Sequence, residues 1–418
     1  MGKKVLVIGG GGREHAIVDA LSRSPQVEKI FCAPGNAGIG LQAENVPIKD
    51  TDVQSLLAFA KQNGVDLTVV GPEAALAVGV VDAFRAEGLK IFGHTKNATR
   101  IESSKEFAKV IMEKYGVPTA AYRSFSDYKE ALEYVSGRPF PAVLKYDGLA
   151  AGKGVVIAEN LAEADAALKS MLLDESFGQG RVVVEDFLTG PEFSFMCFVD
   201  GSRVYPMPLA QDHKRAYDGD KGPNTGGMGA YTGLPFITDE DKAFAYKEIL
   251  CRTAEGMVAE GCPLSGVLYG GLMKTHQGIK VIEFNARFGD PETEVVLPLI
   301  ESDIYETFLA VAEGRETVAP KFRDEVTLGV VLASKGYPGS YSKGFEILGA
   351  EKVNGRVFHM GTKIQDGKLL TNGGRVMMVV ASGKDVRDAR DKVYAEVDKI
   401  SCGNLFHRSD IAHIALEY

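Results

Sequence analysis

The sequence lacks the features of a secreted, membrane-bound or nucleic-acid-binding protein. Its five cysteines are scattered along 418 residues with no C-x-x-C spacing, which excludes a disulfide framework and a cysteine-based zinc site. No apolar run reaches the ~18 residues that a membrane span requires, and the start M-G-K-K leads straight into an apolar stretch, so we expect no signal peptide. The net charge of −9 disfavours nucleic acid and anionic membranes as main partners. We therefore expect a cytoplasmic protein with reduced thiols.

A chain of this length is too long for one hydrophobic core, and the order of its predicted elements divides it into three parts. Strands and helices alternate over residues 1–102, which predicts a Rossmann-like, doubly wound α/β domain. Residues 103–320 form a central domain that includes a small α+β unit at about 123–188. A polar linker at 319–324 leads to a mixed α/β domain at 326–418. The predicted fold class is multidomain α/β.

Two further segments have patterns that predict local structure. Residues 103–135 have a helical pattern that is broken only by G-V-P-T at 116–119. Residues 210–232 are predicted to form one long polar, glycine-rich loop, and loops of this length in compact domains are usually functional or disordered. Asp212, Lys214 and Arg215 in this loop suit a small zwitterion or a phosphate. A mobile surface loop is the alternative.

The densest polar cluster follows a strand at 279–284. Glu283 and Asn285 are two residues apart, so on a strand they share a face, and their oxygens suit Mg²⁺ bound together with nucleotide phosphates. Arg287 continues the alternation, and Asp290 and Glu292 follow closely. A cation beside a metal pair and two carboxylates is typical of a phosphoryl-transfer site. The alternative is an edge strand that ends in a polar turn.

A glycine loop at 9–12 joins the first strand to the first helix. Bare backbone N–H groups of Gly10, Gly11 and Gly12, next to a helix N-terminus, suit an anion. The spacing differs from a dinucleotide fingerprint, because His15 stands where the third small residue should be. We therefore predict a phosphate site, with a tight strand-to-helix turn as the alternative. His15 itself is interpreted as a buried, hydrogen-bonded histidine.

A second glycine loop at 145–154 lies between two predicted strands. It carries Lys145 at its start and Gly152 and Lys153 near its end. A flexible flap of this kind can close over nucleotide phosphates and exclude water. Lys145, on the strand, is the better candidate for a fixed phosphate contact. A solvated loop with two surface lysines is the alternative.

The strand at 181–185 ends in Glu185 and runs into an apolar pair that includes Leu188. Such a linker can offer backbone groups to a base edge and apolar walls to its faces. Glu192, a few residues later, has the chemistry to accept hydrogen bonds from ribose hydroxyls. An ordinary strand end with solvated acids is an equally good interpretation of these residues alone.

Taken together, these motifs resemble one family over nearly the whole chain, the glycinamide ribonucleotide synthetases (phosphoribosylamine–glycine ligases). These are ATP-grasp enzymes of purine biosynthesis. The matching segments are V-L-V-I-G-G-G-G-R-E-H-A at 5–16, A-P-G-N-A-G at 33–38, V-G-P-E-A-A-L-A-V-G-V-V-D at 70–82, D-G-L-A-A-G-K-G at 147–154, Q-D-H-K-R at 211–215, G-P-N-T-G-G-M-G-A-Y at 222–231, the cluster at 282–292, T-N-G-G-R at 371–375 and R-S-D-I at 408–411.

The resemblance implies an ATP-grasp central domain, with the unit at 123–188 as its lid. It also implies that ATP, glycine and 5-phosphoribosylamine give glycinamide ribonucleotide, ADP and phosphate, with Mg²⁺ or Mn²⁺ bound by Glu283 and Asn285. The catalytic residues implied are Arg287, Lys145 and Asp290. The implied nucleotide contacts are Lys105, Lys145, Gly152, Lys153, Glu185, Leu188 and Glu192. The implied substrate contacts are Gly10, Gly11, Gly12, Asp212, Lys214, Arg215, Asn224, Thr225 and Glu292.

The resemblance leaves open which loop holds glycine and which holds phosphoribosylamine. A monomer or weak homo-oligomer is expected. His94 stands where proline is usual in the family, and Tyr146 where a small residue is usual. The alternatives are another ATP-grasp ligase or carboxylase, which would lack the four-glycine loop followed by R-E-H, and a non-catalytic nucleotide-binding protein. The chain has no arrangement typical of a protein nucleophile, which fits direct acyl transfer between substrates.

Overall fold

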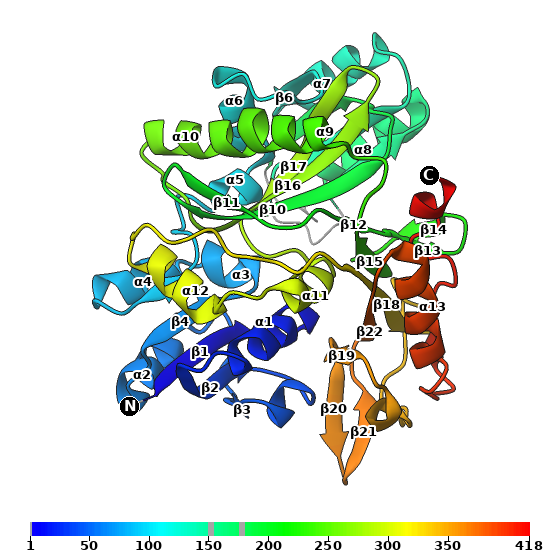
Figure 1. Cartoon of the computed structure of the whole chain (residues 1–418). Coiled ribbons are helices and arrows are strands. Elements are labelled where there is room, and N and C mark those ends of the chain that lie inside the picture. Colours follow the sequence, from blue (N-terminus) through cyan, green and yellow to red (C-terminus); the bar gives the residue numbers. More distant parts are fainter. Residues whose placement is uncertain (1, 149–153, 175–179) are drawn as a thin grey trace.

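The computed structural model describes residues 2–148, 154–174 and 180–418. Its N-terminal part is a parallel sheet with the strand order β3-β2-β1-β4-β5, drawn in blue at the lower left of Figure 1. The strands are β1 (Lys3–Gly9), β2 (Val27–Pro34), β3 (Glu44–Asn45), β4 (Leu67–Val70) and β5 (Ile91–Phe92). The helices that connect them are α1 (Gly12–Ser22), α2 (Val53–Asn63), α3 (Glu73–Ala77) and α4 (Val80–Ala86), with a short η1 (Ile39–Leu41). The predicted Rossmann-like domain is confirmed.

Local sequence signals set the ends of these elements. The apolar run of β1 is fully buried, and α1 starts directly after the glycine turn, where the Gly11 N–H donates to Glu14 Oε2 at 2.6 Å. Helix α2 is capped at its N-terminus by Asp52, whose side chain accepts the Ser55 N–H, and at its C-terminus by Gly64, whose φ of 62° favours glycine.

The lid is an antiparallel sheet with the order β6-β9-β7-β8 and two helices. These elements enclose a hydrophobic cluster of their own. The strands are β6 (Tyr122–Phe125), β7 (Ala142–Tyr146), β8 (Val155–Ala158) and β9 (Val182–Asp186), and the helices are α7 (Tyr128–Ser136) and α8 (Leu161–Leu172).

One prediction for the segment that enters the lid is wrong. The helical pattern over 103–135 is interrupted by β6, so the segment contains α5 (Arg100–Ser103), α6 (Lys105–Lys114), β6 and then α7. Strand β6 pairs with β9, sixty residues away. Its four residues Y-R-S-F give almost no local signal, because the strand is stabilised by that distant partner.

A ten-stranded sheet passes through the central and C-terminal parts, in the order β17-β16-β10-β12-β15-β18-β22-β19, with β11 beside β10 and β23 beside β18. Strand β15, before the predicted linker at 319–324, pairs antiparallel with β18, after it. One sheet therefore continues from the central part into the C-terminal part. The strands of the central part are β10 (Glu192–Asp200), β11 (Arg203–Pro206), β12 (Ala210–Asp212), β15 (Gly229–Thr232), β16 (Ser265–Thr275) and β17 (Gly278–Asn285).

The predicted long loop at 210–232 is also wrong in its local structure. The segment holds β12, β15 and a hairpin of β13 (Arg215–Tyr217) and β14 (Lys221–Asn224). These strands have three or four residues, and glycines and a proline conceal their pattern. Strands β13 and β14 pair with each other and β12 pairs with β15. Strand β15 also pairs with β18, about a hundred residues further along the chain, so part of this register depends on a distant strand.

Helices cover the sheet at the top of Figure 1 and beside the N-terminal part. They are α9 (Asp239–Phe244), which continues through a π-helical turn η2 (Ala245–Cys251) into α10 (Arg252–Ala259), then α11 (Thr293–Val296), η3 (Leu297–Leu299) and α12 (Ile304–Ala312). The C-terminal part contains β18 (Val326–Ser334), η4 (Ala350–Lys352), β19 (Arg356–His359), β20 (Thr362–Gln365), β21 (Lys368–Thr371), β22 (Arg375–Gly383), α13 (Val386–Val397), β23 (Leu405–Phe406) and η5 (Ile414–Glu417).

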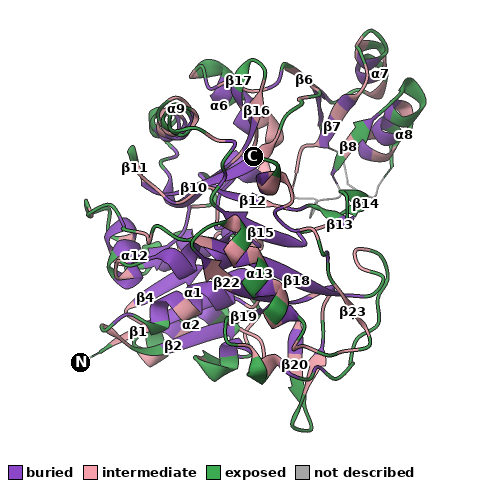
Figure 2. Ribbon diagram, turned by 45° about the vertical axis from the view of Figure 1, so that its right-hand side comes forward, coloured by how far each residue is buried: buried purple, intermediate pink, exposed green. Residues whose placement is uncertain are grey.

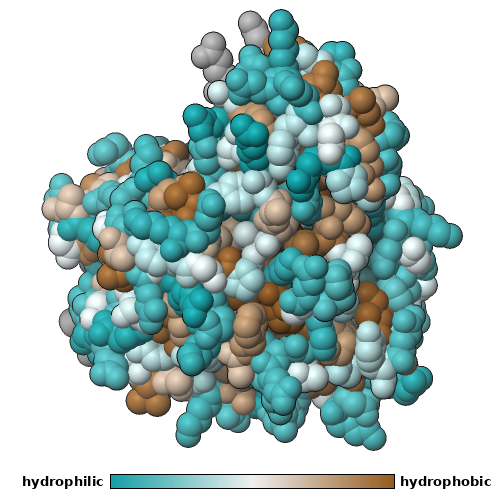
Figure 3. Space-filling model, turned by 90° about the horizontal axis from the view of Figure 1, so that it is seen from above, coloured by the Kyte–Doolittle hydropathy of each residue, from teal (hydrophilic) through white to brown (hydrophobic). Residues whose placement is uncertain are grey.

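The burial pattern follows this arrangement. Figure 2 shows the central strands of the large sheet buried, and exposed residues on the outer faces of α7 and α8 and on β20. Hydrophilic residues cover most of the face drawn in Figure 3, with small hydrophobic patches among them. All five cysteines are free. Among the described residues, none of the helices combines the length and apolarity that crossing a membrane takes.

Candidate active site

The end of β17 brings the two predicted metal ligands to one face of the sheet. Glu283 and Asn285 lie opposite Gly271 and Tyr269 of β16, so both side chains point the same way. Burial would raise the pKa of Glu283, but nearby cations, with Lys105 foremost, outweigh it and lower the pKa. An ionised carboxylate beside an amide oxygen is a donor set that fits a hard divalent cation.

Arg287 lies in a partly buried cluster of charged side chains next to these ligands. Its guanidinium donates to Asn285 Oδ1 at 3.1 Å, and it lies 3.3 Å from Glu102 Oε1 and 3.4 Å from Glu73 Oε2. Glu102 also accepts the backbone N–H of Ala286 at 2.7 Å. Two carboxylates from the N-terminal part and α5 thus fix the direction of Arg287. The sequence did not single out either one as a site residue.

A buried carboxylate holds two lysines beside the same strand. Glu185, at the end of β9, lies 3.0 Å from the Nζ atoms of both Lys145 and Lys109. Lys145 also donates to the carbonyl oxygen of Ile282 at 2.8 Å, which places it against the strand that carries Glu283. The lid and the large sheet are therefore joined through charged groups.

Lys109 is a site residue that the sequence analysis missed. It donates to Thr119 Oγ1 at 2.8 Å, and burial lowers its pKa to about 8 although Glu185 opposes the shift. A signal was present, because Lys105 and Lys109 are one turn apart on α6 and so face the same way. Both line a small pocket together with Glu283.

The remaining predicted nucleotide residues do not line this pocket, or they lie outside the described segments. Leu188 is half-buried in the segment between β9 and β10. Glu192 begins β10 and lies 3.1 Å from Lys214 Nζ, which is the same distance from Asp212. Gly152 and Lys153 lie outside the residues that the structure describes.

Glu292 is a buried acid held by hydroxyl groups. Its Oε1 accepts Tyr269 OH at 2.6 Å and Ser194 Oγ at 2.9 Å. Burial and then the negative charge of Asp212 raise the pKa of Glu292. The Glu292 carboxyl therefore interacts electrostatically with Asp212 and Lys214. The sequence analysis predicts substrate contacts in both of these segments.

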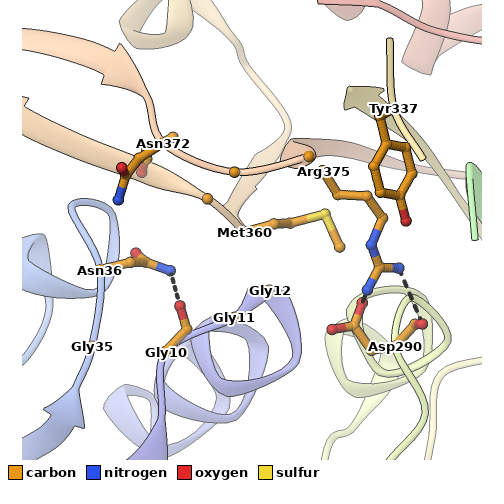
Figure 4. Close-up of a pocket in the computed structure, with 14 residues that line it drawn as sticks. Gly10, Gly11, Gly12, Gly35, Asn36, Asp290, Tyr337, Met360, Asn372 and Arg375 are labelled. Atoms are coloured by element: carbon orange, nitrogen blue, oxygen red, sulfur yellow. Dashed lines mark hydrogen bonds and ion pairs between the residues drawn. The ribbon is translucent and has the colours of Figure 1, made fainter. Parts of the chain in front are cut away.

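The glycine loop forms one wall of a cavity of about 390 Å³ between the N-terminal and C-terminal parts. Figure 4 shows the loop facing residues of the C-terminal sheet across this cavity. Its lining comprises Gly10, Gly11, Gly12, Gly35, Asn36, Asp290, Tyr337, Met360, Gly361, Thr362, Asn372, Gly373, Gly374 and Arg375. The Gly11 N–H is already used by Glu14, so this amide is not free for an anion as the sequence suggested.

Asp290 and Arg375 close one side of the cavity. Arg375 Nη2 lies 2.8 Å from Asp290 Oδ1, and its Nη1 donates to the carbonyl oxygens of Gly226 and Asp290, contacts with Asp290 that are dashed in Figure 4. On the opposite side, Asn36 donates to the carbonyl oxygens of Gly10 and His359. Arg375 was missed as a site residue, although the glycine-rich T-N-G-G-R motif in which it lies was recognised.

His15 is buried close to this wall, where its Nδ1 accepts the backbone N–H of His359 at 2.8 Å. Burial lowers the pKa of His15 to about 3. Its interpretation as a buried, hydrogen-bonded histidine is therefore confirmed.

The hairpin β13–β14 carries three predicted substrate residues away from the buried cluster. Arg215 pairs with Asn224 across the hairpin, and both are exposed. Thr225 Oγ1 donates to the carbonyl oxygen of Lys214 at 2.8 Å. The fully buried Arg408 donates to the carbonyl oxygen of Arg215, so the C-terminal segment fixes the hairpin.

His213, Asp220 and His413 have ligand atoms within 4.8 Å of one another, a spacing that a metal ion could use. The hydrogen bonding argues otherwise. His213 Nε2 accepts the backbone N–H of Ala412 at 2.9 Å, so the neutral ring carries its proton on Nδ1, the atom that faces Asp220, and has no lone pair there for a metal. Arg408 also lies 2.8 Å from Asp220. His213, Asp220, His413 and Arg408 therefore form a polar cluster and not a metal site.

Comparison with known proteins gives the family. Residues 3–102, 103–293 and 327–414 match the N, ATP-grasp (A) and C domains of phosphoribosylglycinamide synthetase. The chain belongs to the phosphoribosylglycinamide synthetase family. It is 51% identical over 414 residues to a phosphoribosylamine–glycine ligase of Listeria innocua, with 97% of this chain and 98% of the relative covered. A ligase of the same name from Salmonella typhimurium is 48% identical over 424 residues, with 99% of each chain covered.

Solved structures agree with this family membership. A phosphoribosylamine–glycine ligase of Thermotoga maritima superposes with a TM-score of 0.86 at 34% identity, and the match covers 98% of this chain and all of that one. The biotin carboxylase domain of a Hydrogenobacter thermophilus 2-oxoglutarate carboxylase gives 0.73 at 16% identity, covering 97% of this chain and 92% of that one. That second likeness shows a shared fold alone. The ATP-grasp ligase fold predicted from the sequence is confirmed.

Proposed function

We propose that this phosphoribosylglycinamide synthetase family member joins glycine to 5-phosphoribosylamine at the expense of ATP, and that it forms glycinamide ribonucleotide, ADP and phosphate in purine biosynthesis. The observation that supports this proposal most strongly is the full-length match, at 51% and 48% sequence identity, to relatives named phosphoribosylamine–glycine ligase. The buried cluster at the end of β17 supplies the chemical groups that such a reaction needs.

The reaction requires two steps at one carboxyl group. The carboxylate of glycine is a poor acylating agent, so one of its oxygens first attacks the γ-phosphorus of ATP, ADP leaves, and glycyl phosphate forms. The amine of phosphoribosylamine then attacks the acyl carbon, the new C–N bond forms, and phosphate leaves. Positioning and charge stabilisation account for catalysis of this kind.

Glu283 and Asn285 fit a divalent cation, for which we propose Mg²⁺ or Mn²⁺. Glu283 is ionised, Asn285 presents a carbonyl-type oxygen, and both share a face of β17. When bound, the ion neutralises charge on the transferring phosphoryl group. Arg287, directed by Glu73 and Glu102, stands beside these ligands to steady the acyl phosphate.

The nucleotide is proposed to lie between the lid and the large sheet. Lys105 and Lys145 approach Glu283 closely enough to lower its pKa, and the same charges suit the phosphates of ATP. The other proposed nucleotide contacts are Glu185 and Leu188 beside adenine, Glu192 at the ribose, and Gly152 and Lys153 in the flap.

The two remaining substrates are proposed to occupy neighbouring regions. Asp212, Lys214 and Glu292 form a group of opposite charges around a buried carboxyl, which suits the zwitterion glycine, with Asp290 close by. The cavity beside Gly10, Gly11 and Gly12 is large enough for a pentose phosphate. The adjoining hairpin is proposed to supply further substrate contacts, from Arg215, Asn224 and Thr225.

An ADP-release assay with glycine and freshly generated phosphoribosylamine, each omitted in turn, tests the proposed function. ADP release must depend on both. Release that requires bicarbonate instead of glycine would identify a carboxylase, and ATP binding without turnover would identify a non-catalytic binding protein. Either result would overturn the proposal.

A further inference from the structure

Lys109 is a buried lysine to which the reaction scheme above gives no part. It lies on α6 with 2% of its surface exposed. Its Nζ lies 3.0 Å from Glu185 Oε2 and donates to Thr119 Oγ1 at 2.8 Å. Burying an ammonium group is costly unless it is paired, so the charge of Lys109 depends on its contact with Glu185.

The carboxylate of Glu185 is shared between two lysines. Its Oε1 lies 3.0 Å from Lys145 Nζ, but this oxygen has no hydrogen-bond partner among the described residues. Lys145 donates instead to the carbonyl oxygen of Ile282 at 2.8 Å. Glu185 therefore attracts Lys145 without being hydrogen-bonded to it.

Thr119 connects Lys109 to the strand that Lys145 also contacts. The Thr119 hydroxyl donates to the carbonyl oxygen of Val281 on β17 at 2.8 Å, and Lys145 donates to the carbonyl oxygen of the next residue of that strand. Both ammonium groups are thus tied to β17, directly or through one hydroxyl, and the Glu185 carboxylate lies between them.

The charges that line the small pocket beside β17 are nearly balanced. Among the described residues, Lys105, Lys109 and Lys145 stand against Glu185 and Glu283, so three positive and two negative charges leave a net charge of +1. Without Lys109 the same lining would be neutral, and Lys145 would be the one described cation still paired with Glu185. A buried carboxylate that loses one of its two cations interacts more strongly with the other.

We propose that Lys109 is a positioning residue of the nucleotide site, which holds Glu185 and thereby leaves the Lys145 ammonium available to the phosphates of ATP. The inference rests on the proposed function and deepens the part of it that places the nucleotide between the lid and the large sheet. Lys109 acts without touching the nucleotide, because Glu185 and Thr119 already bind its ammonium. Its contribution is the positive charge that offsets Glu185.

The test removes the charge of Lys109 and then restores the balance by a second substitution. Lys109→Met keeps most of the length of the side chain without its charge. We expect it to raise the dissociation constant of MgATP in calorimetry by about tenfold, the equivalent of about 1.4 kcal/mol, while KM for glycine stays unchanged. The double variant with Lys109→Met and Glu185→Gln has two lysines against one glutamate around the pocket, again a net charge of +1. It should bind MgATP within about threefold of the unsubstituted protein.

Lys114→Met is the matched control. It removes a lysine from the same helix, but the side chain of Lys114 is largely exposed and pairs with Glu260. The net charge of the chain changes as it does in Lys109→Met, yet MgATP binding should stay unchanged. Melting temperatures show that each variant is folded.

Normal MgATP binding by Lys109→Met, or an equal loss of binding in Lys114→Met, would overturn the proposal. So would a double variant that binds MgATP as weakly as Lys109→Met, because neutralising Glu185 does not repair a purely structural loss. If Lys109→Met does not fold, the double variant decides alone, and binding more than about tenfold weaker than normal would overturn the proposal. Failure of the proposed function is separate. Calorimetry with MgATP needs neither glycine nor phosphoribosylamine, whereas that failure would appear as ADP release that does not depend on both substrates.

Discussion

Lowering the pH should decrease the stability of the protein through His94, which joins the N-terminal part to the large sheet. This fully buried side chain accepts the Ser265 N–H on Nδ1 at 2.9 Å and bonds the Val267 carbonyl oxygen through Nε2 at 2.8 Å. Both partners are on β16, which pairs with β17, the strand that carries the proposed metal ligands. The two bonds require a neutral ring with its proton on Nε2.

Burial lowers the pKa of His94 from 6.5 to about 4. Between these pH values the unfolded chain binds a proton at this position and the folded protein does not, so the stabilisation is complete above pH 6.5 and is lost as the pH falls toward 4. Each pKa unit corresponds to about 1.4 kcal/mol, so the loss reaches about 2 kcal/mol at pH 5 and about 3 kcal/mol below pH 4.

Urea unfolding of the unsubstituted protein and of His94→Asn, at pH 7.5 and at pH 5, measures this contribution. Asparagine can still accept the Ser265 N–H but carries no titrating group near neutrality. The variant should be less stable at pH 7.5, because the bond to Val267 is lost. Its further loss at pH 5 should be about 2 kcal/mol smaller than that of the unsubstituted protein. Equal pH sensitivity in the two proteins would refute the reasoning. His15 and His359 are also buried with lowered pKa values. They are present in both proteins, so their contributions to the pH dependence of stability cancel in the comparison.

Three further predictions concern the site. Glu283→Gln should abolish ADP release while circular dichroism shows a folded protein, and full activity in this variant would contradict the metal assignment. Lys145→Ala should raise KM for ATP more than KM for glycine, since the lysine contacts β17 where we propose that the nucleotide binds. A larger rise for glycine would contradict this placement of the nucleotide. Arg408→Met should lower the melting temperature by several degrees, because it leaves two aspartates without their cation. Arg408→Lys should restore part of the loss. An unchanged melting temperature in the methionine variant would show that this polar cluster contributes little to stability.

Much of the fold could be read from local patterns. The run of β1, the glycine turn after it and the start of α1 are contiguous in the sequence, and so is the hairpin of β16 and β17 that ends in the polar cluster. Such elements are specified by residues a few positions apart. Strand β6 was missed because its pairing partner β9 is about sixty residues away. The strands between 210 and 232 were missed because they are only three or four residues long, and the sheet that orders β12 and β15 is completed by β10 and β18 from outside the segment.

The sequence by itself determined the family, the Rossmann-like start, and the pairing of a carboxylate with an amide oxygen on one face of a strand, because a two-residue spacing on a strand fixes direction without help from elsewhere. Only the tertiary structure decided which distant groups complete the site. Lys109 of α6 meets Glu185 of the lid, and Arg375 meets Asp290 on one side of the cavity. These contacts join segments that no local pattern relates, and the burial that shifts the pKa of Lys109 exists only once the chain has folded.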